Sequence, residues 1–208
     1  MIRWAFYFIG LLLFSLGLTI TIQMQYLGVH PWDVLHIGLY NKLGFSIGSW
    51  NIICSILLII IAFILDKSYI KIGTFLNAFL VGILIDSYLW LDFLPRPGIF
   101  WIDISIMMIG IVLMGIGGGV YNAGMVGAGP RDGFMLSISD KTGISIGKVR
   151  IVVESLVLVL GLLLGGPVFI FTFLITFIQS PLFQLTYLKC KQLVEYLTKD
   201  SSHRKQVI

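Results

Sequence analysis

Long stretches without charge limit the folds open to this chain more than any other feature. The first runs from residue 4 to residue 24, which is 21 residues without a charged side chain. A membrane-spanning helix needs about 20 mostly apolar residues, whereas the apolar core of a signal peptide has only about 7–15. No small-residue cleavage site follows this stretch, so we interpret it as a retained first span.

The composition of the chain excludes a soluble globular domain. Only 12% of the residues are charged and 58% are hydrophobic, with a mean hydropathy of +0.99. Soluble domains carry about 25% charged residues, so this chain lacks the polar surface that water requires. The sequence predicts an all-α integral membrane protein with six spans, near residues 4–25, 48–65, 72–91, 100–122, 149–165 and 168–188.

The distribution of Lys and Arg predicts the orientation of the spans. With the N-terminus inside, twelve of these residues fall on the cytoplasmic side, and only Lys42 and Arg96 fall outside. This bias predicts a multi-pass protein of the plasma membrane with both termini in the cytoplasm. An odd number of spans would place the five basic residues of segment 189–208 outside. A basic cluster next to the last span fits an anionic membrane face, and no nucleic-acid partner is expected.

The chain contains an internal repeat. A shift of 99 residues superposes segment 28–48 on segment 127–147 without a gap, and after a slip of one residue Thr-Phe-Leu at 74–76 matches the same triplet at 172–174. Chance matches between apolar sequences do not involve Gly, Pro, Asp, Lys and Ser, so these matches indicate a duplication. The residues of the first segment that recur are Gly28, Pro31, Asp33, Lys42, Gly44, Ser46, Ile47 and Gly48.

The repeat predicts how the chain is divided. Residues 1–95 form the first membrane repeat, residues 96–188 the second, and residues 189–208 a basic cytoplasmic tail. With three spans in each copy, the second copy enters the membrane from the opposite side. The sequence therefore predicts an inverted repeat, a plan common among secondary transporters.

A short polar helix is expected after the first span of each copy. Pro31 and Pro130 suit the first position of a helix, and Asp33 and Asp132 then lie in the first turn near free backbone N–H groups. Gly28 and Gly127 allow close backbone approach before these turns. Ser46 and Ser145 are expected to cap the following spans. These segments fit either helix starts in connecting loops or half-helices that enter the membrane and point at a central site.

Several polar residues lie within or beside the predicted spans. Glu154 lies one helical turn after Arg150, and an i, i+4 pair lowers the cost of burying both. Either a structural pair near the inner interface or a functional site fits this spacing. The expected substrate or ion pathway comprises Gln23, Asp33, Asn122, Arg131, Asp132 and Glu154. Other polar residues fit a pathway or hydrogen bonds between helices, namely Asn51, Asn77 and Asp86.

No constellation typical of an enzyme is found. The sequence has no nucleophile elbow, phosphate-binding loop or zinc-type His–Glu motif, so no enzymatic activity and no cofactor are expected. Cys54 and Cys190 do not suggest a disulfide framework. The three histidines show no metal-ligand spacing, so no metal site is expected either.

The repeated Pro-x-Asp and Ser-Ile-Gly elements, at residues 31–33 and 46–48 and at their second-half counterparts, resemble those of the YczE/YitT-like family of bacterial membrane proteins. The resemblance covers almost the whole chain. It implies a bacterial plasma-membrane protein without an assigned biochemical activity. Some members of this family are associated with production of secreted metabolites, and the resemblance assigns no site residues.

Two functional hypotheses follow from the sequence. The first is a small secondary transporter or channel-like carrier of a small solute or ion, with its pathway between the two halves. The second is a non-transporting accessory or regulatory protein that stabilises or positions a partner through the segment after Lys189. A homodimer in the lipid bilayer is compatible with both, because 208 residues make a thin bundle around a pore.

Overall fold

The computed structural model of the chain describes residues 1–66, 68, 70–144 and 146–205, and in these residues it contains helices but no strand. The predicted all-helical class is thus confirmed. The elements are α1 (Ile2–Gln23), the short 3-10 helix η1 (Gln25–Leu27), α2 (Pro31–Leu43), α3 (Ile47–Leu65), α4 (Ile72–Trp90), α5 (Phe100–Ala123), α6 (Pro130–Thr142), α7 (Ile146–Leu163) and α8 (Ile170–Lys205).

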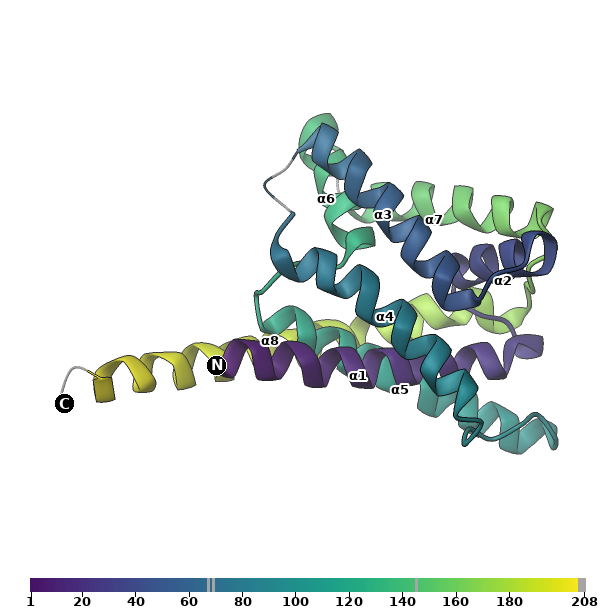
Figure 1. Cartoon of the computed structure of the whole chain (residues 1–208), viewed down its shortest axis with the longest axis horizontal. Helices are drawn as coiled ribbons and strands as arrows, with labels where there is room; N and C mark the ends of the chain where they lie inside the picture. The colour runs from purple at the N-terminus through teal and green to yellow at the C-terminus, as the bar shows by residue number, and fades with distance from the viewer. Residues whose placement is uncertain (67, 69, 145, 206–208) are drawn as a thin grey trace.

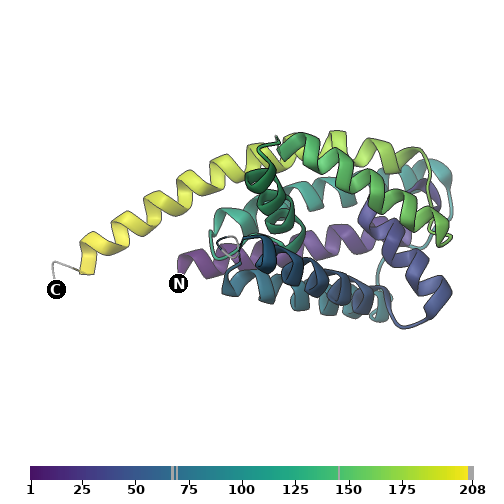
Figure 2. The same cartoon turned by 90° about the horizontal axis from the view of Figure 1, so that it is seen from above.

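The helices form an elongated bundle (Figure 1). The long helices follow its long axis, and successive long helices run in opposite directions. The short helices α2 and α6 have 13 residues each. Helix α2 lies at the end of the bundle away from both termini, whereas α6 lies nearer the end that holds them (Figures 1 and 2). Both ends of the chain thus lie toward the same end of the bundle.

Within the part of the chain that the structure describes, five helices are long and apolar enough to cross a membrane, namely α1, α3, α4, α5 and the Ile170–Thr198 part of α8. Helix α7 is not among them, because its 18 residues include Lys148, Arg150 and Glu154. The rest of α7 nevertheless exposes a row of large apolar side chains, including those of Leu156 and Leu160, which are 61% and 53% exposed. Charge in α7 is therefore confined to its first half.

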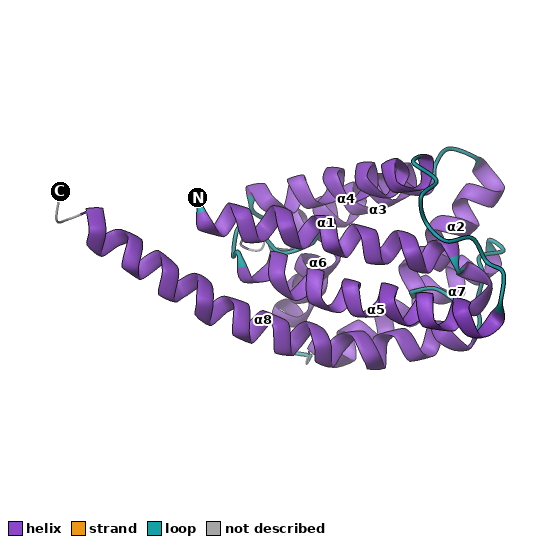
Figure 3. Ribbon diagram, turned by 90° about the horizontal axis from the view of Figure 1, so that it is seen from below, coloured by secondary structure: helices purple, strands orange, loops and turns teal. Residues whose placement is uncertain are grey.

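Helix α8 continues past the end predicted for the last span. The sequence predicts a span ending at residue 188 and a separate basic tail, whereas the helix runs unbroken from Ile170 to Lys205. Its last part extends beyond the bundle (Figures 2 and 3). Pro181 lies inside the helix without ending it.

Small residues bring the central helices α1 and α5 close together. A Cβ atom added to Gly17 would lie 2.6 Å from the carbonyl oxygen of Gly110, and one added to Gly117 would lie 2.3 Å from the backbone nitrogen of Phe14. Real Cβ atoms do not make such short contacts, so these positions require glycine. Close approach through small residues is the usual packing mode of helices in a membrane, where apolar contact alone gives no preference over lipid.

Several further helix contacts occur in matching pairs, one in each pair for each half of the chain. The short helix α2 packs on α7, and the short helix α6 packs on α3. In the same way, α4 packs on α1 and α8 packs on α5. Figure 3 shows the resulting arrangement, with α1 and α5 adjacent along the bundle.

The segments before the two short helices make matching contacts. Gly28, with a φ of +108°, lies so close to α8 that an added Cβ would be 2.7 Å from the nitrogen of Thr172. An added Cβ on Gly127 would be 2.6 Å from the nitrogen of Thr74 in α4. Each threonine hydroxyl accepts a hydrogen bond of 3.2 Å from the backbone N–H three residues earlier. The two short helices thus begin against equivalent helix starts.

One long-helix pair is sealed at the end of the bundle that holds α2. As predicted, Ser46 caps α3, accepting a hydrogen bond from the N–H of Ser49. Ser46 also donates to Asp86 of α4, and the N–H of Gly48 donates to the same carboxylate at 2.9 Å. An added Cβ on Gly48 would lie 2.1 Å from the oxygen of Gly82. Asp86 therefore joins two helices through hydrogen bonds.

The corresponding pair in the second half is not closed in this way. Within the described part of the chain, α7 and α8 are not among the helix pairs that pack against each other. The expected capping residue of α7, Ser145, lies outside the described residues.

Candidate functional site

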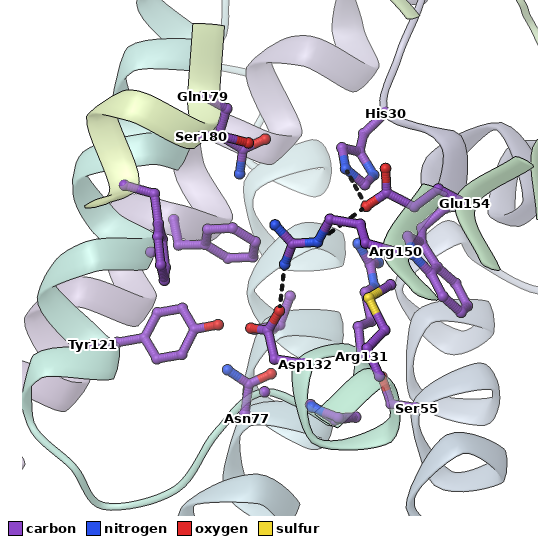
Figure 4. A pocket seen from close by; sticks show the side chains of 18 of the residues that line it. His30, Ser55, Asn77, Tyr121, Arg131, Asp132, Arg150, Glu154, Gln179 and Ser180 are labelled. Carbon is purple, nitrogen blue, oxygen red and sulfur yellow. Dashed lines mark hydrogen bonds and ion pairs between the residues drawn. The ribbon is translucent and has the colours of Figure 1, made fainter. Parts of the chain in front are cut away.

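A cavity of about 340 Å³ lies inside the bundle, and each α-helix described above contributes residues to its lining. This volume falls within the range of about 300–1,000 Å³ typical of small-molecule sites. Arg131, Asp132, Arg150 and Glu154 supply its charged lining (Figure 4). Gln179 and Ser180 of α8 lie across the cavity from Glu154.

The first turns of the two short helices meet beside this cavity. Pro31 and Pro130 occupy the first helical positions, as predicted. The guanidinium of Arg131, in α6, lies 5.2 Å from the centre of the Trp32 ring in α2. Its Nη2 atom is 3.7 Å from Oδ1 of Asp33, whose side chain is fully buried. One arginine thus connects both helix starts through a cation–π contact and an ion pair.

A second ionic cluster joins α6 to α7. Arg150 donates a hydrogen bond of 3.0 Å to Oδ1 of Asp132, and its Nε lies 3.7 Å from Oε1 of Glu154. The i, i+4 pair predicted in α7 is therefore present. Nε2 of His30, just before α2, lies 3.9 Å from the same Glu154 oxygen. Figure 4 shows Arg150 between its two acidic partners.

Burial differs sharply among the charged side chains. Asp33 is 0% exposed and Glu154 is 14% exposed, whereas Asp132 and Arg150 are 31% and 41% exposed. Arg131 lies between these groups at 20%. Buried charges are expensive unless they are paired, which explains why each of these side chains lies within 4.0 Å of an opposite charge.

The lining follows the internal repeat. Positions 30 and 129, 32 and 131, 51 and 150, and 55 and 154 all contribute side chains or backbone to the cavity, and the members of each pair are 99 residues apart. The two members differ in chemistry, because Asn51 and Ser55 of α3 correspond to Arg150 and Glu154 of α7. The charge of the cavity is therefore carried mainly by the second half of the chain.

A second cavity of about 350 Å³ adjoins the first. The two share Asp132, Met135, Arg150, Phe183 and Tyr187 as lining residues. The second is also lined by Lys71 and Met125, which belong to loops at the end of the bundle that holds the termini. The second cavity therefore lies between the central cavity and that end of the bundle.

The structure brings together most, but not all, of the residues expected on a pathway. Asp132, Arg131 and Glu154 line the central cavity, and Asp33 lies directly behind Arg131. Gln23 lines neither cavity. Asn122 lines only the second cavity, and its amide donates to the carbonyl of Gly118 at 2.9 Å.

Sequence reasoning missed several lining residues. Gln179 and Gln184 had a usable signal, because both are amides within an apolar span. Trp32 and Tyr121 had none, because aromatic residues in membrane helices usually pack against lipid or protein. His30 precedes Pro31, and only the fold brings it to Glu154.

Among the described residues, no group of three or more His, Cys, Asp or Glu side chains is arranged to hold a metal ion. Cys54 and Cys190 form no disulfide. The polar groups around the cavity are instead two guanidinium groups, two carboxylates, an imidazole and several amides and hydroxyls. This set can bind a small polar or charged solute through hydrogen bonds and ion pairs.

Comparison with known proteins places the chain in a family. A family model described as a family of unknown function (DUF6198) matches residues 1–187. The chain belongs to this family. Among its relatives is the uncharacterised membrane protein YczE of Bacillus subtilis (strain 168), which is 34% identical over 195 residues, covering 94% of this chain and 90% of YczE. The resemblance expected from the repeated motifs is confirmed.

Two further relatives also lack an assigned activity. The uncharacterised protein YyaS of Bacillus subtilis (strain 168) is 35% identical over 176 residues, covering 83% of this chain and 86% of YyaS. An uncharacterised protein of Haemophilus influenzae is 34% identical over 166 residues, covering 77% and 74% of the two chains. No solved structure matches the chain. The relationship to YczE and the long apolar helices identify a membrane protein.

Proposed function

We propose that this protein is a carrier of a small polar solute, and that the central cavity is its binding site. The observation that carries this proposal is the meeting of the α2 and α6 starts at Arg131, Trp32 and Asp33 beside a cavity of about 340 Å³. Irregular backbone and charge inside a membrane protein are tolerated where they line a polar cavity. Such residues are candidates for a substrate or ion site.

The proposed carrier has six spans, namely the five clearly apolar helices and α7. The charged residues Arg150 and Glu154 of α7 face the cavity, whereas Leu156 and Leu160 are exposed, as expected for a lipid-facing side. Helices α2 and α6 are each about 20 Å long at 1.5 Å per residue. This length is short of the roughly 30 Å hydrocarbon core, so they enter the membrane without crossing it.

The two halves are proposed to form an inverted repeat. The paired packing supports this, because the contact of α2 with α7 has its counterpart in that of α6 with α3, and the contact of α4 with α1 has its counterpart in that of α8 with α5. The contacts of Gly28 with Thr172 and of Gly127 with Thr74 form another matching pair. An axis in the membrane plane that relates the halves would pass near the cavity, where many transporters bind their substrates.

Both termini are proposed to lie in the cytoplasm, with the protein in the plasma membrane. The ends of the chain lie at one end of the bundle, and the bias of Lys and Arg favours that end as the cytoplasmic one. The second cavity then lies on the inward side of the central one, while Ser46, Gly48 and Asp86 join the outer ends of α3 and α4. This arrangement corresponds to an inward-facing carrier.

A binding screen followed by transport tests the proposal. Purified protein is screened by thermal shift against a broad panel of small organic acids, amines, amino acids and sugars. Compounds that raise the Tm are then tested for uptake into proteoliposomes. We expect Arg150→Gln to abolish both effects, because Arg150 holds Asp132 and Glu154 in the cavity.

The matched control is Arg96→Gln, which removes an arginine that is 73% exposed and pairs only locally with Asp92. This variant should retain binding and uptake. A panel in which no compound binds, or uptake that is equal in the wild type and Arg150→Gln, would count against the carrier.

The extension of α8 beyond the bundle favours one alternative, a non-transporting protein that positions a partner. Leu193 and Tyr196, late in α8, are 46% and 70% exposed. Deletion of residues 190–208 distinguishes the two functions. Loss of a stoichiometric partner from the purified complex, with the thermal-shift profile unchanged, favours the accessory role. Retained uptake after the deletion favours the carrier.

A further inference from the structure

The carboxylate of Asp33 lies beside the cavity and is fully buried. Neither of its oxygen atoms has a hydrogen-bond partner among the described residues. It forms ion-pair contacts with Nδ1 of His36 at 3.5 Å and with Nη2 of Arg131 at 3.7 Å. Both histidine nitrogens are also buried and without a hydrogen bond. Asp33 and His36 are thus buried together, and among the described residues Arg131 is the permanently charged cation that forms an ion pair with Asp33.

Arg131 itself is not confined to this pocket. Its side chain is 20% exposed and lines the central cavity, with its guanidinium against the Trp32 ring. A guanidinium offers five N–H donors in a planar fork that matches a carboxylate or a phosphate. An anionic group bound in the cavity would therefore compete with Asp33 for the same arginine.

We propose that Asp33 and His36 form the proton-binding site of the carrier, and that Arg131 couples this site to an anionic solute. When a carboxylate or phosphate group of the solute binds Arg131, Asp33 loses its cationic partner and takes up a proton from water. The solute and the proton then occupy the protein together. This inference rests on the proposed carrier function and adds the coupling ion and the charge of the solute.

A proton fits this site better than a metal cation does. Hard cations such as Ca²⁺ and Mg²⁺ take several oxygen ligands. The groups that face Asp33 are instead an imidazole and a guanidinium, and no metal-binding group of three or more acidic, His or Cys side chains is formed by the described residues. A proton needs only one lone pair of the carboxylate, which both oxygens have free.

The other charged and titratable groups near Asp33 do not replace Arg131. His30 precedes α2 and is directed to Glu154. Helix α7, which packs on α2, brings Glu154 and Arg150, and these two form an ion pair with each other. Helix α3 also packs on α2 and contributes the thiol of Cys54 near Arg131. Removal of Arg131 therefore leaves Asp33 without a strong cationic partner.

Infrared spectroscopy of the purified full-length protein tests the proton site without a known solute. A protonated carboxyl group in a dry site gives a C=O stretch that is separate from the bands of ionised carboxylates. We expect no such band from Asp33 in the wild type at neutral pH. As the pH is lowered from neutral, Arg131→Gln should show it at a higher pH than the wild type does, and the double variant Arg131→Gln/Asp33→Asn should lack it. The matched control Arg131→Gln/Asp86→Asn should keep it.

The pH at half protonation should rise by about one to three units in Arg131→Gln, because an opposite charge at this distance lowers the proton affinity of a carboxyl group by that amount. Arg131→Lys keeps a positive charge and replaces Arg131→Gln in the test if that variant does not fold. Its pH at half protonation should lie between those of Arg131→Gln and the wild type. A spectrum of Arg131→Gln without the band, or a band that persists in Arg131→Gln/Asp33→Asn, overturns the proton site.

These outcomes are separate from those of the transport assay. If the band behaves as expected but no solute is taken up, the proton site stands and the carrier function fails. If uptake is found but the band is absent, the carrier stands with another coupling ion or none.

Discussion

The Arg131–Asp33 pair is the residue-scale contact on which both proposals depend. It joins two short helices from different halves of the chain, with the aspartate fully buried. Removal of one partner of a buried pair leaves an uncompensated charge, which costs about 3–5 kcal/mol. We therefore expect Arg131→Gln to lower the free energy of unfolding by about 3–5 kcal/mol at neutral pH, measured by denaturant unfolding in detergent.

A second substitution, Asp33→Asn, distinguishes the loss of the ion pair from the loss of side-chain packing in Arg131→Gln. Asp33→Asn added to Arg131→Gln removes the unpaired carboxylate, so the double variant should be more stable than Arg131→Gln alone. Arg96→Gln breaks an exposed pair and should have little effect. A double variant that is no more stable than Arg131→Gln would show that Arg131 acts by packing on Trp32 rather than by neutralising Asp33.

The sequence indicated which polar residues form this site, but it did not indicate which of them pair with each other. Pro-x-Asp at each half-helix start, and Glu154 one turn after Arg150, were recognisable because polar residues at set spacing stand out against apolar sequence. The partner of Arg131 was not recognisable, because Asp33 is 98 residues away and only the fold brings them together. Gln23 was expected on the pathway from its polarity alone, but it lies outside both cavities.

At the scale of elements, helices α3 and α4 pack closely against each other, and we call their interface at Gly48 and Gly82 the α3–α4 seam. A Cβ on Gly48 would lie 2.1 Å from the backbone oxygen of Gly82, which is too short for any real contact. We expect Gly48→Ala to force the helices apart and to destabilise the protein by about 1–3 kcal/mol, as overpacking commonly does. Thermal or denaturant unfolding of the purified protein measures this change.

Gly98→Ala is the matched control, because the only heavy atom near its added Cβ is the carbonyl oxygen of Arg96 at 3.9 Å. This variant should be as stable as the wild type. Equal stability of the two alanine variants would mean that the α3–α4 seam is loose in solution.

Helix α7 marks the limit of element prediction from hydropathy. The sequence placed a span near residues 149–165, and a helix is present at residues 146–163, but its three charged residues keep it out of the group of five clearly apolar helices. Only the fold explains why a membrane helix carries these charges, because it places Arg150 and Glu154 on the lining of a cavity. The length of α8 was also missed, because the polar residues after residue 188 carry no apolar signal.

At the scale of the whole molecule, the inverted arrangement predicts opposite membrane sides for the two short helices. Asn41 and Asp140 are 99 residues apart, lie near the ends of α2 and α6, and are exposed. In a protein with Cys54 and Cys190 replaced by Ser, we expect Asn41→Cys to react with an impermeant maleimide in intact cells. Asp140→Cys should react only after permeabilisation. Labelling of both from the same side would exclude the inverted topology.

The difference between the two halves also predicts a second conformation. In an inverted repeat, a helix contact formed within one half can also form between the equivalent helices of the other half. Helices α3 and α4 pack together at their seam, whereas the equivalent helices α7 and α8 are not packed together in the described residues. At the closed seam, Ile52 lies against Gly82, with a Cβ on that glycine 2.5 Å from Cγ1 of the isoleucine. The counterparts of these residues in the second half are Ile151 and Ser180. An outward-facing carrier would bring these two together.

Disulfide trapping tests for that conformation. In the background without Cys54 and Cys190, the pair Ile151→Cys and Ser180→Cys should form a disulfide under mild oxidation in native membranes, because transient closure of α7 on α8 brings the thiols within bonding distance. The control pair Leu163→Cys and Ser180→Cys should not, since Leu163 lies about 18 Å further along α7. Both yields are measured by mass spectrometry of the linked peptides. Equal yields would mean that α7 does not close on α8, so the open seam would be a permanent feature of the fold rather than one state of a carrier.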